Sequence, residues 1–429
     1  MESGAGNIPV PEKGSPSVAA VLHGPIEEAP RTVEDRARAR ARKAHALQDS
    51  ASPFRSYWLG GYHTEHHTDD CTGSALLQDY QRILEFGIAS VREKALWSGI
   101  DRGGFHHLHG IETRAAIAAS AGIQIVWTLY TRPWPNDVPF FSARFVERFG
   151  RYAKAMAECV TQVAPEFVPV FAPINEITFE AWQLYSKGKA RRLNGTRPSP
   201  GEVRHQLVRA ALAASQAILE VAPHARLLHA DPLEHVVAPL DRPDLQEEAA
   251  RRCELQFGTW DLLCGRGGRD LGGQPRYLDL VGVNYYAENQ WEVGSGKRLA
   301  WQMDDARRLP LSSLLKRAHA RYGRPLVIAE TSHNGVRRGT WVREIATEVR
   351  DAARIGIPVE GICIDPIIDQ RDLESGQWLR RGLWELQPGG DLAQSPDASY
   401  ATALRMAQRI TDDRSIGNDP GRHLREQLA

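Results

Sequence analysis

The chain has 429 residues, 42% of them hydrophobic and 25% charged, and its 53 basic and 53 acidic residues give a formal net charge of zero. These proportions are typical of a soluble globular protein. A chain without net positive charge has no global field that would attract a polyanion or an anionic membrane, so we expect neither nucleic acid nor a membrane as partner.

The cysteine pattern and the N-terminal segment both bear on location. The five cysteines are scattered without C-x-x-C spacing, which is typical of reduced thiols rather than of a disulfide framework. The first 30 residues lack the apolar core of a signal peptide, and no apolar run approaches the roughly 18 residues of a membrane span. These features predict a cytoplasmic protein.

From Phe54 onward, short apolar runs alternate with amphipathic helical stretches. Near-continuous apolar strands separated by helices indicate a parallel sheet that is covered on both faces, and eight of them favour closure into a (β/α)₈ TIM barrel. The eight predicted strands are Ser56–Gly61, Ile88–Arg92, Ile123–Tyr130, Phe167–Ile174, Ala225–Ala230, Leu278–Tyr286, Leu326–Ala329 and Val359–Ile364. Longer helices are predicted over Ser142–Val163, Gly201–Ala222 and Thr340–Ile355.

This organisation predicts one domain with two flanking segments. Residues 1–50 form an N-terminal extension that is disordered by composition, apart from a short polar helix after Thr32. The barrel is expected over residues 51–411, ending with a helix near Pro396–Ile410, and residues 412–429 form a polar tail.

Polar side chains follow several of the predicted strands, at the end of a barrel where active sites lie. They are Arg92, Asn175, Glu176, Asp231, Asn284, Tyr285, Tyr286, Glu330 and Asp365. Glu176 and Glu330 directly follow the fourth and seventh strands, so their carboxylates face each other across the mouth of the barrel. Such a pair can cleave a glycosidic bond, one carboxyl protonating the leaving oxygen while the other attacks the anomeric carbon.

Six ordered motifs between Tyr57 and Leu386 resemble those of glycoside hydrolase family 1, the β-glucosidase-like enzymes. The resemblance implies a retaining β-glycosidase with a carbohydrate or glycoside substrate and no cofactor, and with Glu176 as acid/base and Glu330 as nucleophile. The motifs are SVREKALWSGI from Ser90, TLYTRPWP from Thr128, PINE from Pro173, DLVGVNYY from Asp279, PLVIAE from Pro325 and RRGLW from Arg380.

The resemblance also implies supporting roles around the two glutamates. Arg92 and Tyr286 are expected to donate hydrogen bonds to Glu330. Asn175 is expected to contact the sugar 2-hydroxyl, a bond that strengthens in the transition state. The carboxyl groups of a retaining pair lie about 5–5.5 Å apart.

The chain departs from the family pattern where the sugar is recognised. Thr131 replaces a histidine, Asp365 replaces a tryptophan, and the segment with Arg371 and Asp372 replaces an aromatic and acidic one. We therefore expect weak activity on simple β-glucosides and a charged or modified glycone. The substrate-binding candidates are Asn284, His63, Thr131, Trp134, Asp365, Arg371 and Asp372.

Two other functions stay open on the sequence. The histidines at positions 63, 66 and 67 and at 106, 107 and 109 could converge on a metal in a metal-dependent barrel hydrolase, although we expect no metal. The second of these functions is a non-catalytic carbohydrate-binding barrel, but binding alone does not require both carboxylates.

Overall fold

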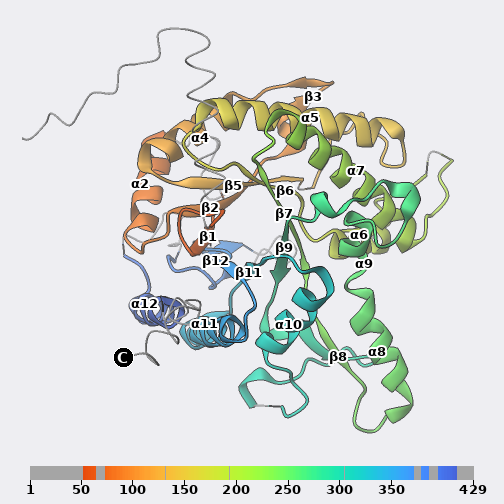
Figure 1. Ribbon diagram of the computed structural model, residues 1–429, viewed down its shortest axis with the longest axis vertical. Helices are drawn as coiled ribbons and strands as arrows, with labels where there is room; N and C mark the ends of the chain where they lie inside the picture. The colour runs from red at the N-terminus through yellow and green to blue at the C-terminus, as the bar shows by residue number, and fades with distance from the viewer. Residues whose placement is uncertain are drawn as a thin grey trace, which may run out of the picture. The chain divides into compact units, whose positions relative to one another are not determined.

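The computed structural model describes residues 52–63, 73–130, 132–192, 194–303, 305–371, 378–385 and 395–412, with side chains up to Gln370 in the fifth of these ranges. Its centre is a closed barrel of eight parallel strands in the order β1-β12-β11-β9-β7-β6-β5-β2 (Figure 1). The strands are β1 (Trp58–Gly61), β2 (Ser90–Lys94), β5 (Gln124–Tyr130), β6 (Val170–Ile174), β7 (Arg226–Pro232), β9 (Leu280–Asn284), β11 (Leu326–Thr331) and β12 (Val359–Ile364). The predicted fold class is confirmed, and each strand overlaps its predicted run.

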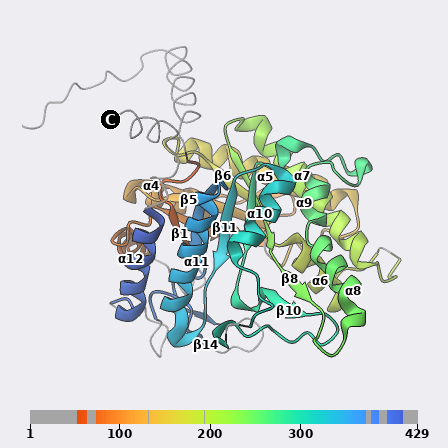
Figure 2. The ribbon, with the colours of Figure 1, turned by 60° about the horizontal axis from the view of Figure 1, so that its bottom comes forward.

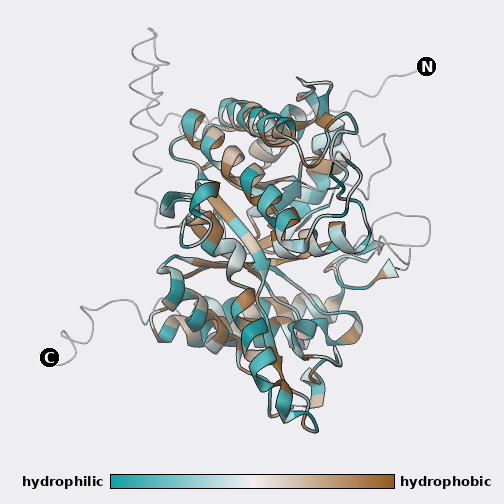
Figure 3. Ribbon diagram, turned by 90° about the vertical axis from the view of Figure 1, so that its right-hand side faces the viewer, coloured by the Kyte–Doolittle hydropathy of each residue, from teal (hydrophilic) through white to brown (hydrophobic). Residues whose placement is uncertain are grey.

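Helices surround the barrel and bury their apolar faces against the strands. They are α2 (Gly73–Leu84), α4 (His109–Ala121), α5 (Ala143–Val163), α7 (Pro200–Val221), α10 (Leu311–Tyr322), α11 (Arg338–Arg354) and α12 (Ala398–Asp412). Figure 3 colours the ribbon by hydropathy and shows that the helices carry both polar and apolar residues. The apolar stripe of α5, for example, places Phe145, Phe149 and Met156 in the core.

The barrel interior is filled by small and branched side chains. Leu59, Val126, Ala172, Val327 and Ala329 are members of one buried cluster inside it. They come from alternate positions of different strands, because successive strand residues point to opposite faces. The interior is therefore a packed core, and open space begins only at the strand ends.

Additional short elements follow the C-terminal ends of the strands and build walls there. They are α3 (Trp97–Ile100), β3 (Asp101–Arg102), β4 (Phe105–His106), α6 (Ile177–Ser186), β8 (His235–Val237), α8 (Gln246–Leu255), α9 (Gly258–Leu263), β10 (Gln290–Glu292), β13 (Gln370–Arg371) and β14 (Trp378–Leu379). Single 3₁₀ turns also occur, at Pro243–Leu245, Arg269–Leu271, Pro275–Tyr277, Ala287–Asn289, Trp301–Met303 and Gly335–Arg337. Figure 2 shows β8, β10 and β14 in the lower part of the view.

Some expectations concern residues that the structure does not describe. The N-terminal extension with its short helix, the tail after Asp412, Thr131, Asp372 and the side chain of Arg371 lie outside the described residues. Within the described part, no helix is long and apolar enough to cross a membrane.

Candidate active site

Glu176 stands at the junction between β6 and α6, in an uncommon backbone conformation. It is the one non-glycine residue of the described chain with a positive φ, at 50°. This left-handed conformation costs an L-residue on the order of 1–3 kcal/mol and is concentrated at functional sites. The strand ends at Ile174 and the helix begins at Ile177, so the turn directs the Glu176 side chain to the mouth of the barrel.

Asp231, at the end of β7, fixes the start of the helix that Glu176 precedes. Its carboxylate accepts hydrogen bonds from the backbone nitrogen of Thr178 at 3.0 Å and from the Thr178 hydroxyl at 2.7 Å. A carboxylate at the first turn satisfies a free N–H group of the helix and suits its dipole. The backbone nitrogen of Glu176 also donates to Ala230 of β7 at 2.8 Å, so the turn is held from the neighbouring strand.

Three donors converge on Glu330 at the end of β11. Arg92 Nη1 donates to its Oε1 at 2.8 Å, Asn175 Nδ2 donates to the same oxygen at 2.8 Å, and Tyr286 Oη donates to Oε2 at 3.1 Å. The Arg92 side chain is only 4% exposed and that of Glu330 is 15% exposed. The expected contacts of Arg92 and Tyr286 with Glu330 are therefore present, and both carboxylate oxygens are used as acceptors.

Two amide side chains connect the two glutamates. Asn284 Nδ2 donates to Glu176 Oε1 at 2.8 Å and lies 3.4 Å from Asn175 Oδ1. Asn175 Oδ1 also accepts from Arg92 Nη2 at 2.7 Å. Arg92, Asn175, Glu176, Asn284 and Glu330 thus form one hydrogen-bonded network at the C-terminal end of the barrel.

The protonation of Glu176 differs from that of an ordinary glutamate. Burial of the carboxyl and then the nearby negative charge of Glu330 raise the pKa of Glu176 to about 8. The hydrogen bond from Asn284 and the charge of Arg92 act in the opposite direction but are weaker. Glu176 is therefore mainly a carboxylic acid at neutral pH, and it has a proton to give.

A further strand-end carboxylate, Asp365, pairs with His63 at 2.9 Å. Burial raises the pKa of Asp365, but His63 and then Arg92 outweigh this and bring it to about 2. Gly61 of β1 makes room for the pair, since a Cβ there would lie 2.3 Å from Asp365 Oδ2. The His63 Nδ1 atom is buried and has no hydrogen-bond partner among the described residues, so the pair offers a polar atom beside the network.

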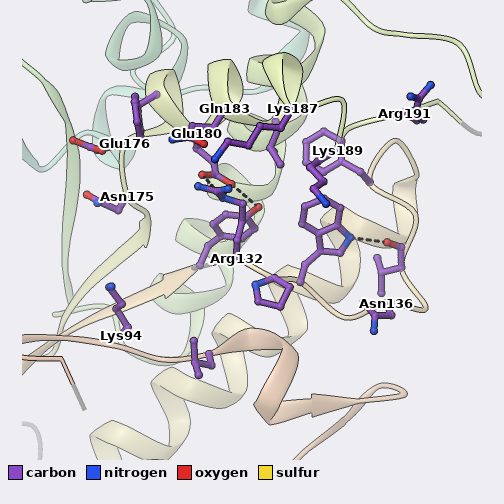
Figure 4. A pocket seen from close by; sticks show the side chains of 18 of the residues that line it. Lys94, Arg132, Asn136, Asn175, Glu176, Glu180, Gln183, Lys187, Lys189 and Arg191 are labelled. Carbon is purple, nitrogen blue, oxygen red and sulfur yellow. Dashed lines mark hydrogen bonds and ion pairs between the residues drawn. The ribbon is translucent and has the colours of Figure 1, made fainter. Parts of the chain in front are cut away.

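An open chamber of about 1280 Å³ begins at Asn175 and Glu176 and extends over α6 and the loop after β5. Trp134 lines it, and its indole nitrogen is held by Val138 O at 3.0 Å. Figure 4 shows the chamber running from Asn175 and Glu176 past Arg132 and Lys187 to Lys189. Of the sequence candidates, Trp134 therefore lines the same chamber as Glu176, while Asn284, His63 and Asp365 lie with the buried network.

Sequence reasoning missed most of the chamber wall. Its charged and polar members include Lys94, Arg132, Glu180, Gln183, Lys187, Lys189, Arg191, Arg192 and Arg381. One signal was available: Glu180, Gln183 and Lys187 follow Glu176 by four, seven and eleven residues, which is the spacing of one helix face. Lys94 and Arg381 carry no such signal, because only the closed barrel brings them to α6.

The two histidine groups do not meet in the described structure. His63 pairs with Asp365, and His106 lies beside Tyr152 with ring centroids 6.1 Å apart. Across the described ranges, no three His, Cys, Asp or Glu side chains are arranged to hold a metal ion. His66 and His67 lie outside those ranges.

The barrel fold is shared with solved structures of known glycosidases. Family 1 β-glucosidase from Thermotoga maritima matches with a TM-score of 0.65 and 13% identity, over 84% of this chain and 99% of that one. The β-glycosidase from Thermosphaera aggregans matches with a TM-score of 0.64 and 15% identity, over 84% and 99%. The virulence factor SghA, solved with its substrate analogue salicin, matches with a TM-score of 0.63 and 17% identity, over 86% and 98%.

The chain therefore has a fold like that of family 1 β-glucosidases, and at these identities the likeness concerns the fold alone. No protein-family profile and no curated protein matches the sequence. The fold expected from the six motifs is thus confirmed by structure rather than by sequence similarity.

Proposed function

We propose that this protein is a retaining β-glycosidase in which Glu330 is the nucleophile and Glu176 the acid/base. The observation that carries the proposal is the contrast between the two carboxyl groups. Glu176 is partly buried, and desolvation together with the charge of Glu330 raises its pKa to about 8. Glu330 accepts hydrogen bonds from three donors, one of them the cationic Arg92. A pair of carboxyl groups in such different environments supplies one acid and one base.

In the first step, a Glu330 oxygen forms a bond to the anomeric carbon while the bond from that carbon to the leaving oxygen breaks. Glu176 gives its proton to that oxygen, so the aglycone departs as a neutral hydroxyl. The negative charge of Glu330 is consumed in the new ester. Arg92, Asn175 and Tyr286 hold the attacking carboxylate in place, so that no reorganisation is needed at the moment of reaction.

The second step reverses these roles. Once Glu330 is esterified, the charge that raised the pKa of Glu176 is gone, and Glu176 is ready to act as base. It removes a proton from water, the water oxygen bonds to the anomeric carbon, and the Glu330 ester bond breaks. Both substitutions invert the carbon, so the sugar leaves with its original β configuration.

The stereochemical course tests this function directly. Aryl β-glycosides of several sugars are incubated with the enzyme, and the anomeric proton of the first-formed sugar is followed by NMR before mutarotation. We expect the β-anomer to appear first. First appearance of the α-anomer would instead support inversion, for which the carboxyl groups lie about 6.5–9.5 Å apart. No hydrolysis of any β-glycoside would favour the non-catalytic binding barrel.

The raised pKa of Glu176 predicts the alkaline limb of the activity profile. Glu176 acts first as an acid, so activity requires its protonated form, which is present below a pH of about 8 and lost above it. We expect kcat/KM to fall about tenfold per pH unit well above pH 8. The profile is measured with a poor leaving group, for which protonation matters most. A plateau that continues unchanged to about pH 10 would contradict the assignment.

The sugar itself is proposed to lie over Asn284, His63 and Asp365, on the Glu330 side of the network. His63 and Asp365 are both buried and held by each other. Fixed polar groups of this kind orient a ligand through its hydroxyl groups. Because Asp365 replaces the family's tryptophan, and Arg371 and Asp372 replace its aromatic and acidic segment, we propose weak activity on simple β-glucosides.

A further inference from the structure

The chamber next to Glu176 is where the leaving group of the proposed reaction must lie. The acid protonates the leaving oxygen, so the aglycone is on the Glu176 side of the scissile bond. Asn175 and Glu176 line the chamber, whereas Glu330, His63 and Asp365 do not. The chamber therefore continues away from the sugar along α6, the helix that begins directly after the acid (Figure 4).

The chamber is strongly basic although the whole chain has no net charge. Seven of its lining residues are Lys or Arg and two are Glu, while the chain as a whole holds 53 basic and 53 acidic residues. Arg132 is paired with Glu180, one of these two glutamates, at 2.9 Å, and the other is the protonated Glu176. Arg192 is paired with Glu202, which does not line the chamber. Among the described residues of the wall, basic side chains still outnumber acidic ones, and this excess gives the chamber a positive potential.

Lys187 and Lys189 stand at the end of α6, where the chamber leads away from Glu176. Both are exposed, and Figure 4 shows them on the same side of the chamber as Gln183. For Lys189, no ion pair is present within the described ranges. Ammonium groups in this position can reach an anion that is carried at the far end of a leaving group.

Two buried polar atoms in the same wall lack hydrogen-bond partners among the described residues. They are Oε1 of Gln183, a residue that is 8% exposed, and Nε of Arg381. Buried polar groups are normally hydrogen-bonded, so an unpartnered one calls for an explanation such as a bound water or ion, or a functional role. The wall thus holds a polar amide and a guanidinium that a polar ligand can satisfy.

Another part of the wall is aromatic. Phe179 lines the chamber and stacks on Trp182, with ring centroids 5.6 Å apart and an interplanar angle of 29°. Phe179 is 41% exposed and Trp182 is 56% exposed. Exposed stacked rings beside a cavity provide a flat apolar surface, which an aromatic ring or a sugar face can cover.

We propose that the leaving group of this enzyme is anionic: a flat aglycone of the aromatic-acid type, which lies on Phe179 and Trp134 and whose negative charge faces Lys187 and Lys189. This inference rests on the proposed function, because it takes Glu176 as the acid. It differs from the expectation of a charged glycone, because the cationic wall lies beyond Glu176 rather than around His63 and Asp365.

The test compares two aryl β-glycosides that differ in one charge, the 4-carboxyphenyl and the 4-carbamoylphenyl glycoside of the same sugar. We expect the wild-type enzyme to prefer the carboxylate about tenfold in kcat/KM at low salt, mainly through KM. The preference should shrink at about 1 M salt, where the Debye length is about 3 Å. The double variant Lys187→Gln and Lys189→Gln should lose most of the preference, whatever the intrinsic reactivity of the two leaving groups.

Lys154→Gln is the matched control, since Lys154 is an exposed lysine of α5 that does not line the chamber. It should leave the ratio of the two substrates unchanged. A ratio in the double variant equal to that of the wild type would overturn the proposal. So would a ratio that Lys154→Gln lowers as much as the double variant does.

A binding measurement separates failure of this inference from failure of the proposed function. Free 4-hydroxybenzoate and its neutral analogue 4-hydroxybenzamide are titrated into wild type and the double variant by calorimetry. Tighter binding of the benzoate that depends on the two lysines supports the anionic chamber even if no glycoside is cleaved. If neutral aryl glycosides are hydrolysed but neither binding nor substrate preference depends on the two lysines, the proposed glycosidase function stands and the anionic leaving group is rejected.

Discussion

Glu330→Ala is expected to reduce kcat/KM at least about a thousandfold, because it removes the group that forms the covalent intermediate. The substitution leaves a space beside the anomeric carbon that a small anion such as azide can enter. Azide then attacks from the face opposite the leaving group, and no second displacement follows. The product should be an α-glycosyl azide, identified by NMR with an activated aryl glycoside as substrate.

The matched control is Glu166→Ala, which removes an exposed carboxylate from the loop before β6, at the other end of that strand from Glu176. It should retain wild-type activity and form no azide product. Circular dichroism should show that Glu330→Ala is folded. Substantial activity of Glu330→Ala without azide, or a β-configured azide product from it, would remove Glu330 from the role of nucleophile.

The barrel was predictable because its strands differ from its helices in a simple way. A strand that is buried on both faces is mostly apolar, as in Gln124–Tyr130 and Val359–Ile364, where the predicted run and the strand nearly coincide. Boundaries were less certain where polar residues are buried within a strand. β2 continues through Glu93 to Lys94, beyond the predicted end at Arg92, because Glu93 is buried against Arg114 and Tyr80.

The hydrogen-bonded network was predictable because each of its members lies at or just after the C-terminal end of a strand. Arg92, Asn175, Glu176, Tyr286 and Glu330 needed only the rule that parallel strand ends meet at one side of a barrel. The hydrogen bonds within the network were not all predictable. Asn175 was expected to contact the sugar, but the structure also gives it an internal role, because it donates to Glu330 and accepts from Arg92.

The chamber depends on contacts between segments that are far apart in the sequence. Lys94 is the last residue of β2, Lys189 follows α6, and Arg381 comes from the segment after β14. Each of these residues resembles an ordinary surface residue when the sequence is read alone. Their joint positive charge is visible only when the strand ends have been brought together, and for this reason the sequence pointed to a charged sugar but not to a charged leaving group.

Glu176→Ala is expected to behave differently from Glu330→Ala, and this difference decides which carboxyl has which role. Loss of the acid should slow cleavage of substrates with poor leaving groups about 10²- to 10⁴-fold, whereas substrates with good leaving groups need little protonation and should be affected less in the first step. For substrates with good leaving groups, the fall in activity above about pH 8 should disappear in Glu176→Ala, because the carboxyl group that titrates there has been removed.

The azide product supplies the second measurement. Glu330 is intact in Glu176→Ala, so the glycosyl-enzyme still forms, but no base then activates water for the second step. Azide needs no base, and its attack on the β face of the intermediate should give a β-glycosyl azide. The two variants should therefore yield opposite anomers. If Glu176→Ala gave the α-glycosyl azide and Glu330→Ala the β-glycosyl azide, the two glutamates would exchange roles, and Asn284 rather than Arg92 would be the donor that holds the nucleophile.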